Sequence, residues 1–392
     1  MDTNRIQRII AKVDTPCFVV DLELLNNNLK ILDLVQKKAG CKILLALKGF
    51  AMFSAFPLIN KYLNGVCASG LNEAKLGFEE FKKEVHTFSP GFTEKEFPEI
   101  IRYSDHIIFN SISQLEQFKP FIKKNPKIKF GLRINPEKSV AGIKFGVYDP
   151  CSKNSRLGIT LNNLEGKDIA GVSGLHFHAL CEQDADALEQ VLSEFDKKFS
   201  KYIKMISWVN FGGGHHITRE DYDTEKLCRL IINFKKRYPN IKEVYLEPGE
   251  AVALNTGILV TTVVDIVKNE KPIAILDTSV ECHLPDVLIT RHEPQPYIPE
   301  VIGAAEPNKY QYTYSLAGVS CAAGDVIGEY SFKNPLTIGE KIIFLDAAHY
   351  SMVKTNTFNG IGLPSIYTFD PKKDKLNLIR KFGYEDYKTR LS

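Results

Sequence analysis

The sequence lacks any close pair of cysteines, although it contains eight of them in 392 residues. They stand singly at positions 17, 41, 67, 151, 181, 228, 282 and 321, without the Cys-x-x-Cys spacing of a zinc or redox motif. A chain of this length buries enough apolar surface to fold without disulfides. We therefore expect reduced, mostly buried cysteines and no metal site.

Long hydrophobic runs are also missing. No stretch approaches the roughly 20 consecutive apolar residues that span a membrane. The first residues, MDTNRIQRIIAKVDTP, carry charges throughout and lack the apolar core of a signal peptide. The expectation is a cytoplasmic protein that does not bind membranes.

Neither sign of charge dominates, because 50 Lys and Arg residues face 47 Asp and Glu residues and leave a net charge of +3. The pairs Lys82-Lys83 and Lys372-Lys373 are typical of a solvated surface, so nucleic-acid binding is not expected. Hydrophobic residues at 44% and charged residues at 25% match an ordinary globular protein, and the length suits two domains.

Eight short runs typical of β-strands alternate with helical stretches. They are KILLALK (42–48), NGVCAS (64–69), EVHTFS (84–89), HIIFNS (106–111), IKFGLRIN (128–135), GVSGLHFH (171–178), SWVNFGG (207–213) and EVYLEPG (243–249). Helical spacing of apolar residues is clear in 187–202 and weaker in 71–81 and 115–122. Eight such units predict an α/β fold with a closed (β/α)8 barrel. An open doubly wound sheet is the alternative, disfavoured because no G-x-G-x-x-G turn occurs.

The pattern changes after residue 250. The runs ILVTTVVDIV, PIAILDTS and KIIFLDAA are β-rich and are separated by Pro, Gly and Asn turns. We therefore expect a barrel over 22–262, followed by a separate β-rich domain over 263–392.

Polar residues end several of the barrel runs, and the carboxyl ends of barrel strands form the functional face. Lys48 ends the first run, where burial would favour a neutral amine able to form an imine with an aldehyde cofactor. A surface lysine capping the strand is the alternative. His176 and His178 end the sixth run on one face, without a third metal ligand at a suitable spacing. One ring stacking on an aromatic group is preferred over a merely packed histidine.

The last two runs end in a glycine turn and a carboxylate. Gly212, Gly213 and Gly214 follow the seventh run, where backbone N–H groups can approach a phosphate, although a flexible turn would look the same. Glu247 ends the eighth run, and a buried carboxylate there needs a partner such as a protonated pyridine nitrogen. Lysine, histidine, glycine turn and glutamate together predict one site.

These segments resemble the fold-type III, alanine-racemase-like decarboxylases that use pyridoxal 5′-phosphate (PLP). The resemblance identifies Lys48 in A-L-K-G-F as the Schiff-base lysine, and His178 in H-F-H-A as the histidine that stacks on the cofactor. It identifies G-G-G at 212–214 as the phosphate loop, and Glu247 in E-P-G as the partner of the pyridine nitrogen.

The resemblance continues into the β-rich domain. S-C-A-A-G-D at 320–325 matches the element that carries a cysteine across a dimer interface, here Cys321, which would donate a proton. In Y-S-M-V-K-T-N-T-F-N-G, Tyr350 would contact the phosphate and Phe358 would line the substrate pocket. The resemblance thus implies a homodimer with shared active sites, and it implies that residues 1–21 join the β-rich domain.

Within this family, L-A-L-K-G-F, L-H-F-H-A-L-C-E and E-P-G-E-A are most similar to the carboxynorspermidine/carboxyspermidine decarboxylases. Related enzymes usually have a phosphate-binding arginine where this chain has Glu250, and often an aspartate where it has Val66. A carboxylate at 250 favours a cationic substrate, and Asp286 aligns with a position that binds a distal amine. Glu182 and Glu281 complete a candidate acidic lining, although each acid could instead form a structural ion pair.

The implied reaction is the PLP-dependent decarboxylation of carboxynorspermidine or carboxyspermidine in polyamine biosynthesis. A diaminopimelate, ornithine or arginine decarboxylase of the same fold is the first alternative. A racemase is disfavoured, because Cys321 stands where racemases have a tyrosine. A PLP-binding regulator without activity would be expected to have lost the lysine or the phosphate loop, and both are present.

Overall fold

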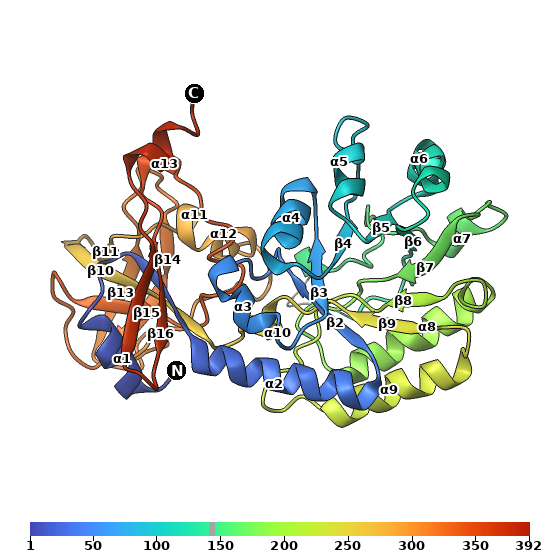
Figure 1. Cartoon of the computed structure of the whole chain (residues 1–392). Coiled ribbons are helices and arrows are strands. Elements are labelled where there is room, and N and C mark those ends of the chain that lie inside the picture. The colour runs from blue at the N-terminus through green and yellow to red at the C-terminus, as the bar shows by residue number, and fades with distance from the viewer. Residues whose placement is uncertain (141–145) are drawn as a thin grey trace. The chain divides into compact units, whose positions relative to one another are not determined.

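The computed structural model describes residues 1–140 and 146–392. The chain divides into two compact units, one of Asn26–Val252 and the other of Met1–Leu25 with Ala253–Ser392 (Figure 1). Across the described residues, every helix is too short or too polar to cross a membrane.

The first unit contains eight parallel strands that close into a barrel in the order β2 to β9. The strands are β2 (Lys42–Ala46), β3 (Gly65–Ala68), β4 (Glu84–Phe88), β5 (His106–Phe109), β6 (Lys129–Arg133), β7 (Val172–His176), β8 (Trp208–Asn210) and β9 (Glu243–Leu246). The barrel closes where β9 pairs with β2, with Lys42 opposite Tyr245. Each predicted run contains one of these strands, so the closed barrel is confirmed and the open sheet is wrong.

Helices connect the strands. They are α2 (Leu22–Ala39), α3 (Phe56–Ile59), α4 (Leu71–Leu76), α5 (Phe97–Arg102), α6 (Ile112–Lys124), α7 (Leu161–Leu164), α8 (Ala185–Ile203), α9 (Thr224–Arg237) and α10 (Glu250–Ala253). The helices predicted at 187–202 and 115–122 are present as α8 and α6. The stretch 71–81 is divided, because α4 ends at Leu76 and a π-helical turn follows over Gly77–Phe81. Gly77 allows this turn to pack closely, since a Cβ there would lie 2.4 Å from Val66 Cγ2 of β3.

A single tryptophan fills the barrel interior. Trp208 is buried and packs with Leu44, Ile108 and Tyr245. Two glycines on neighbouring strands make room for its ring. A Cβ on Gly131 would lie 2.5 Å from Trp208 Cη2, and a Cβ on Gly174 would lie 1.9 Å from Trp208 Cε2. These glycines are therefore required by the packing of the core rather than by the backbone conformation.

We predict that Gly174→Ala lowers the free energy of unfolding by about 1–3 kcal/mol, because the added methyl group overpacks the core around Trp208. Urea denaturation monitored by tryptophan fluorescence measures the change, since the chain has one tryptophan. Gly91→Ala is the matched control, because a Cβ there has no atom within 4 Å. Equal stability of the two variants would contradict the packing argument.

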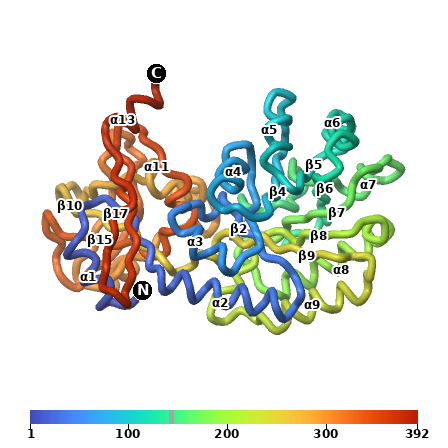
Figure 2. Tube along the Cα trace, in the orientation of Figure 1, coloured from blue at the N-terminus to red at the C-terminus, as the bar shows by residue number. Residues whose placement is uncertain are grey.

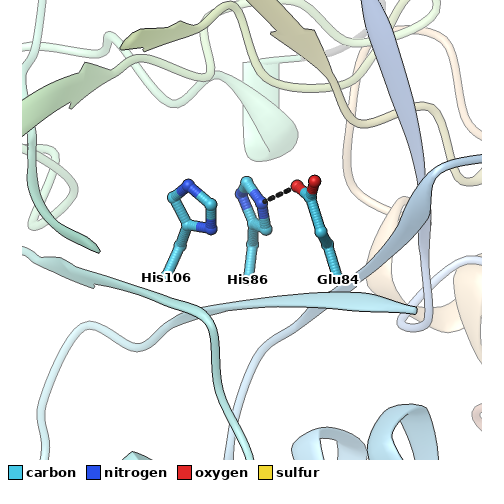
Figure 3. Close-up of side chains that lie close together, drawn as sticks. All are labelled: Glu84, His86 and His106. Carbon is cyan, nitrogen blue, oxygen red and sulfur yellow. Dashed lines mark hydrogen bonds and ion pairs between the residues drawn. The ribbon is translucent and has the colours of Figure 1, made fainter. Parts of the chain in front are cut away.

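A buried polar cluster lies at the amino-terminal end of the barrel strands (Figure 3). His86 Nε2 is 3.3 Å from Glu84 Oε2, and the His86 and His106 rings are stacked with centroids 3.7 Å apart. Lys42 Nζ is 2.5 Å from Glu84 Oε1 and 2.7 Å from Glu243 Oε1. The ligand-type atoms of the Glu84–His86–His106 cluster lie within 4.8 Å of one another, but stacked rings direct their nitrogens side by side and Lys42 already balances Glu84. We therefore interpret it as an ion-paired closure of the barrel end.

The second unit is built on a nine-stranded sheet, in the order β12-β14-β13-β11-β10-β1-β16-β17 with β15 paired to β10. The strands are β1 (Cys17–Asp21), β10 (Gly257–Lys268), β11 (Pro272–Leu276), β12 (Ala304–Ala305), β13 (Tyr312–Ala317), β14 (Val326–Phe332), β15 (Lys341–Phe344), β16 (Ser365–Asp370) and β17 (Lys375–Arg380). Short helices accompany them: α1 (Thr3–Ile10), α11 (Val280–His283), α12 (Pro285–Ile289) and α13 (Tyr384–Lys388). The expected β-rich domain is confirmed as a unit separate from the barrel, and this unit comprises Met1–Leu25 and Ala253–Ser392.

The amino-terminal segment belongs to this sheet. Strand β1 pairs antiparallel with β10 and parallel with β16. Figure 2 shows the blue amino-terminal trace among the orange and red strands of the unit. Its buried residues Cys17 and Val19 pack with Ile258, Val260 and Phe369 in one hydrophobic cluster. The two ends of the chain therefore share one core.

Candidate active site

Glu247 is the centre of a buried polar cluster at the carboxyl ends of the barrel strands. It follows β9 and is 7% exposed. Asn210 Nδ2 donates to Glu247 Oε1 at 2.6 Å, and His176 Nε2 is 3.3 Å from Oε2. Burial raises the pKa of Glu247, but His176 and Asn210 outweigh burial and lower this pKa to about 2. The carboxylate is therefore ionised near neutral pH and suited to a cationic partner.

His178 and the glycine turn are joined by a backbone hydrogen bond. Gly213 N donates to His178 Nδ1 at 2.9 Å, which fixes the plane of the imidazole. Burial, with a smaller contribution from the charge of Lys48, lowers the pKa of His178 well below its usual value. The ring is therefore neutral, with Nδ1 as the acceptor.

The glycine turn uses two of its N–H groups internally. Gly212 N donates to Asn210 Oδ1 at 2.8 Å, and Gly213 N donates to His178. The N–H of Gly214 has no acceptor among the described residues. A Cβ on Gly214, whose φ is +79°, would lie 2.0 Å from Leu180 O. Glycine is therefore required here by close backbone contacts, and only part of the turn remains able to bind an anion.

Lys48 lies in a turn, two residues beyond the end of β2 at Ala46, and its side chain is exposed. The expectation of a buried strand-end lysine is therefore wrong. Ala46 O accepts the N–H groups of Gly49 and Phe50 at 2.9 and 3.2 Å, and these bonds close the turn that carries Lys48. Its amine makes no hydrogen bond or ion pair with the described residues, so an aldehyde can reach it.

The Lys48 turn packs directly against the segment that follows Glu247. A Cβ on Gly49 would lie 2.8 Å from Gly249 Cα, so the two backbones are in close contact. The charge of Lys48 also acts on His178, as its effect on the pKa of that ring indicates. The structure thus brings the predicted lysine, histidine, glycine turn and glutamate together at one end of the barrel.

Three residues of this site were not predicted from the sequence. Asn210 holds both Glu247 and Gly212. Arg133, at the end of β6, is buried, with Nη2 3.3 Å from His178 O, and burial lowers its pKa to about 10. Burial and the charge of Glu247 raise the pKa of the Cys67 thiol. Asn210 and Arg133 are polar residues at the ends of apolar runs, which was the signal that could have identified them.

The sequence spacing offered His176 and His178 no third metal ligand, but the fold supplies Glu247 from a distant strand. Ligand-type atoms of these three side chains lie within 4.8 Å of one another. His178 Nδ1 already accepts from Gly213, and Glu247 from Asn210. We interpret the group as a hydrogen-bonded cluster that orients Glu247 rather than as a metal centre.

The remaining predicted residues belong mostly to the other unit. Cys321 is exposed, and its N–H donates to Asn359 Oδ1 at 2.8 Å, which ties it to the turn that contains Phe358. Asp286 Oδ1 accepts from Lys354 Nζ at 2.5 Å, and that ammonium lies 4.9 Å from the centroid of the Tyr350 ring. The structure therefore pairs Cys321 with Asn359, and Asp286 with the ammonium group of Lys354.

Glu250 is the first residue of α10 in the barrel unit. His216 Nε2 lies 3.1 Å from its Oε1. The carboxylate at position 250 therefore has an imidazole partner.

The family profile described as "Pyridoxal-dependent decarboxylase, C-terminal sheet domain" matches residues 17–348. A carboxynorspermidine/carboxyspermidine decarboxylase of Campylobacter jejuni is 48% identical over 97% of this chain and 99% of its own length. A carboxyaminopropylagmatine decarboxylase of Synechocystis is 42% identical over 97% of this chain and 96% of its own length.

Solved structures agree with these matches. The crystal structure of carboxynorspermidine decarboxylase from Campylobacter jejuni, complexed with norspermidine, has a TM-score of 0.87 and 46% identity, covering 96% of this chain and 100% of that one. A diaminopimelate decarboxylase from M. jannaschii shares the fold at a TM-score of 0.77 and 20% identity, covering 98% and 93% of the two chains. The chain therefore belongs to the pyridoxal-dependent decarboxylases of fold type III.

Proposed function

We propose that the protein decarboxylates carboxynorspermidine or carboxyspermidine, which yields norspermidine or spermidine for polyamine biosynthesis. The observation that carries this proposal is the 48% identity to the Campylobacter jejuni enzyme, which extends over 97% of the chain. Carboxyaminopropylagmatine is a second candidate substrate, because a decarboxylase named for it is 42% identical. Diaminopimelate is a weaker candidate, since the diaminopimelate decarboxylases are only distantly similar.

The barrel residues fit pyridoxal 5′-phosphate as the cofactor. Two observations support the fit: the buried carboxylate of Glu247 stays ionised, and the amine of Lys48 is accessible and without a partner among the described residues. When bound, pyridoxal supplies an electron sink for the bond that breaks. Lys48 would hold the cofactor covalently through Nζ, Glu247 would pair with the ring nitrogen, and the neutral ring of His178 would stack on it.

The phosphate of the cofactor would bind at the glycine turn. Gly214 N–H is the donor of the turn that has no acceptor among the described residues. We assign Tyr350 as a further phosphate contact, as the family resemblance implies. The N–H groups of Gly212 and Gly213 would not bind the phosphate directly, because they already donate to Asn210 Oδ1 and His178 Nδ1 and hold these two side chains in place.

Substrate recognition is assigned to Glu250, Asp286 and Phe358. Carboxy-polyamines carry several ammonium groups, and carboxylates bind them by charge-assisted hydrogen bonds. In the structure Asp286 pairs with Lys354, which is the structural ion pair considered as the alternative for these acids. A substrate ammonium would exchange with Lys354 at that carboxylate.

We also propose a homodimer with shared active sites, in which Cys321 is supplied by the neighbouring subunit and donates the proton that replaces the lost carboxylate. The exposure of Cys321 is compatible with this role. Gel filtration combined with light scattering would measure the assembly.

The proposed reaction is tested by carbon dioxide release from the purified, PLP-loaded protein. We expect turnover of carboxynorspermidine and carboxyspermidine, with kcat/KM for diaminopimelate lower by about 100-fold or more, because its distal carboxylate would face Glu250. Carboxyaminopropylagmatine is measured in parallel. The proposal fails if diaminopimelate is the best substrate of the four.

A further inference from the structure

Asn210 joins two separate parts of the candidate cofactor site. It is the last residue of β8, and its side chain is fully buried. Its Nδ2 donates to Glu247 Oε1 at 2.6 Å, and its Oδ1 accepts the N–H of Gly212 at 2.8 Å. A planar side-chain amide can donate to a carboxylate and accept a backbone N–H at the same time, which a carboxylate or a hydrocarbon in its place could not. One rigid group therefore connects the glycine turn to Glu247.

The backbones of these two segments are also in contact. Glu247 N donates to Gly212 O at 2.8 Å, and Phe211 N donates to Tyr245 O at 2.9 Å. A Cβ on Gly213 would lie 2.4 Å from Glu247 O. A shift of the glycine turn therefore moves the acceptor end of Asn210 and the backbone of Glu247 together.

The other neighbours hold the Glu247 carboxylate less firmly. His176 Nε2 lies 3.3 Å from Oε2, and neither ring nitrogen of His176 makes a well-formed hydrogen bond among the described residues. The thiol of Cys67 also acts on the carboxylate, but S–H is a weak donor. The orientation of Glu247 therefore depends mainly on Asn210. A carboxylate offers about four lone-pair sites, so the bond from Asn210 leaves Glu247 able to accept a further N–H.

We propose that Asn210 is a positioning residue that couples phosphate binding at the glycine turn to the pairing of Glu247 with the ring nitrogen of the cofactor. This inference rests on the cofactor contacts given under the proposed function and adds Asn210 to them. Phosphate bound at the turn fixes Gly212, Gly212 fixes the amide of Asn210, and the amide fixes the carboxylate. Coupling between binding sites is reciprocal, so pairing at Glu247 strengthens phosphate binding by the same factor.

The advantage of this connection is a carboxylate that is ordered before the ring nitrogen arrives. Glutamate is among the side chains that lose most rotamer freedom when they are ordered. A group that is already held in its bound orientation loses less on binding, so the affinity is higher. Without Asn210, Glu247 would keep its charge but would have to be ordered by the cofactor itself.

The test measures how much the ring nitrogen contributes to binding. The full-length protein is freed of cofactor, and equilibrium dialysis gives the dissociation constants of PLP and of 1-deazapyridoxal 5′-phosphate, in which carbon replaces the ring nitrogen. We call the ratio of the two constants the nitrogen factor. We expect a nitrogen factor of about tenfold or more for the wild-type protein and of about threefold or less for Asn210→Leu, a side chain of similar size. A general loss of stability cancels, because both ligands bind to the same variant.

The same ratio for pyridoxal and 1-deazapyridoxal, which lack the phosphate, tests the coupling. For the wild-type protein we expect the nitrogen factor to fall by about fivefold or more when the phosphate is absent. For Asn210→Leu the factor should be the same with and without phosphate, within about twofold, because the connection between the two parts is lost.

Further variants locate the effect. Glu247→Gln should lose the nitrogen factor by itself, and adding Asn210→Leu should then change it no further if Asn210 acts through Glu247. Asn210→Ser should reproduce Asn210→Leu, and it leaves space for water to satisfy the N–H of Gly212 should the leucine variant fold poorly. Asn135→Leu is the matched control. Asn135 is another buried asparagine after a barrel strand, but its side chain bonds to backbone groups at 137 and 157, so the nitrogen factor should not change.

Several results would overturn the proposal. A wild-type nitrogen factor in both Asn210 variants would remove Asn210 from the cofactor site, and additive effects of Asn210→Leu and Glu247→Gln would give it a purely structural role. Equal nitrogen factors with and without phosphate in the wild-type protein would exclude the coupling. If the wild-type protein binds the nitrogen and carbon forms equally, the assignment of Glu247 to the ring nitrogen fails and the inference fails with it. If the coupling is found but carboxynorspermidine releases no carbon dioxide, the proposed reaction fails and the role of Asn210 stands.

Discussion

Replacing Lys48 with alanine is expected to abolish both the visible absorption of protein-bound pyridoxal and the release of carbon dioxide. A primary amine is required to hold an aldehyde cofactor covalently, and a methyl group cannot replace it. We expect kcat to fall by on the order of 10⁴-fold or more, as for removal of a covalent catalytic group. Absorption spectra of the purified variant and single-turnover assays measure the two effects.

The loss at Lys48 should occur without unfolding. Its side chain is exposed and makes no hydrogen bond or ion pair with the described residues, so the melting temperature of the cofactor-free protein should change little. Lys61→Ala is the matched control, because Lys61 is another exposed lysine of the same unit. An absorption band that survives at full height in Lys48→Ala would show that another amine holds the cofactor.

The barrel could be predicted from the sequence because each of its strands is a short apolar run bounded by turn residues. The local pattern sets the strand, and the number of repeats sets the closed topology. The end of β2 could not be predicted in the same way. The turn at Lys48 depends on contact between Gly49 and Gly249, residues 200 positions apart, and apolar periodicity does not report such a contact.

Only part of the candidate site could be predicted from the sequence, because some of its residues are placed by contacts between distant segments. Glu247, His178 and the glycine turn were found because they directly follow strands, where a barrel gathers its functional residues. Asn210, which orders both Glu247 and Gly212, was missed although it is the last residue of β8, because its side chain bonds to residues of other loops and the sequence does not show those contacts. The internal use of the Gly213 N–H by His178 depends on two loops meeting and has no sequence signal.

For the acidic residues, the sequence indicated the residue types but not their partners. The sequence predicted an acidic lining, but it could not show which of these acids are balanced by partners within the protein. Asp286 is paired with Lys354, and Glu250 faces His216, so neither is an isolated negative charge. An ammonium group that binds at Asp286 or Glu250 must therefore displace Lys354 or compete with His216, and the contact that is lost reduces the net gain in binding free energy.

Glu247→Gln is expected to lower kcat by about 10²–10³-fold while the cofactor stays bound through Lys48. The substitution keeps the shape of the side chain and its contact with Asn210 but removes a charge that the native site keeps ionised, with a pKa of about 2. A neutral amide cannot balance a protonated ring nitrogen, so the electron sink is weakened in the step that breaks the carbon–carbon bond. Steady-state kinetics and the visible spectrum measure rate and cofactor content separately.

Glu243 provides the control for this effect, because it begins the strand that Glu247 follows. Glu243 begins β9 and pairs with Lys42 and Lys129 at 2.7 Å each, at the opposite end of the barrel from Glu247. Glu243→Gln should therefore affect stability but leave kcat within about twofold, since partly exposed ion pairs contribute little to the site. Equal losses of kcat in the two variants would mean that both carboxylates act by stabilising the fold rather than by contact with the cofactor. A fully active Glu247→Gln would exclude Glu247 as the partner of the ring nitrogen.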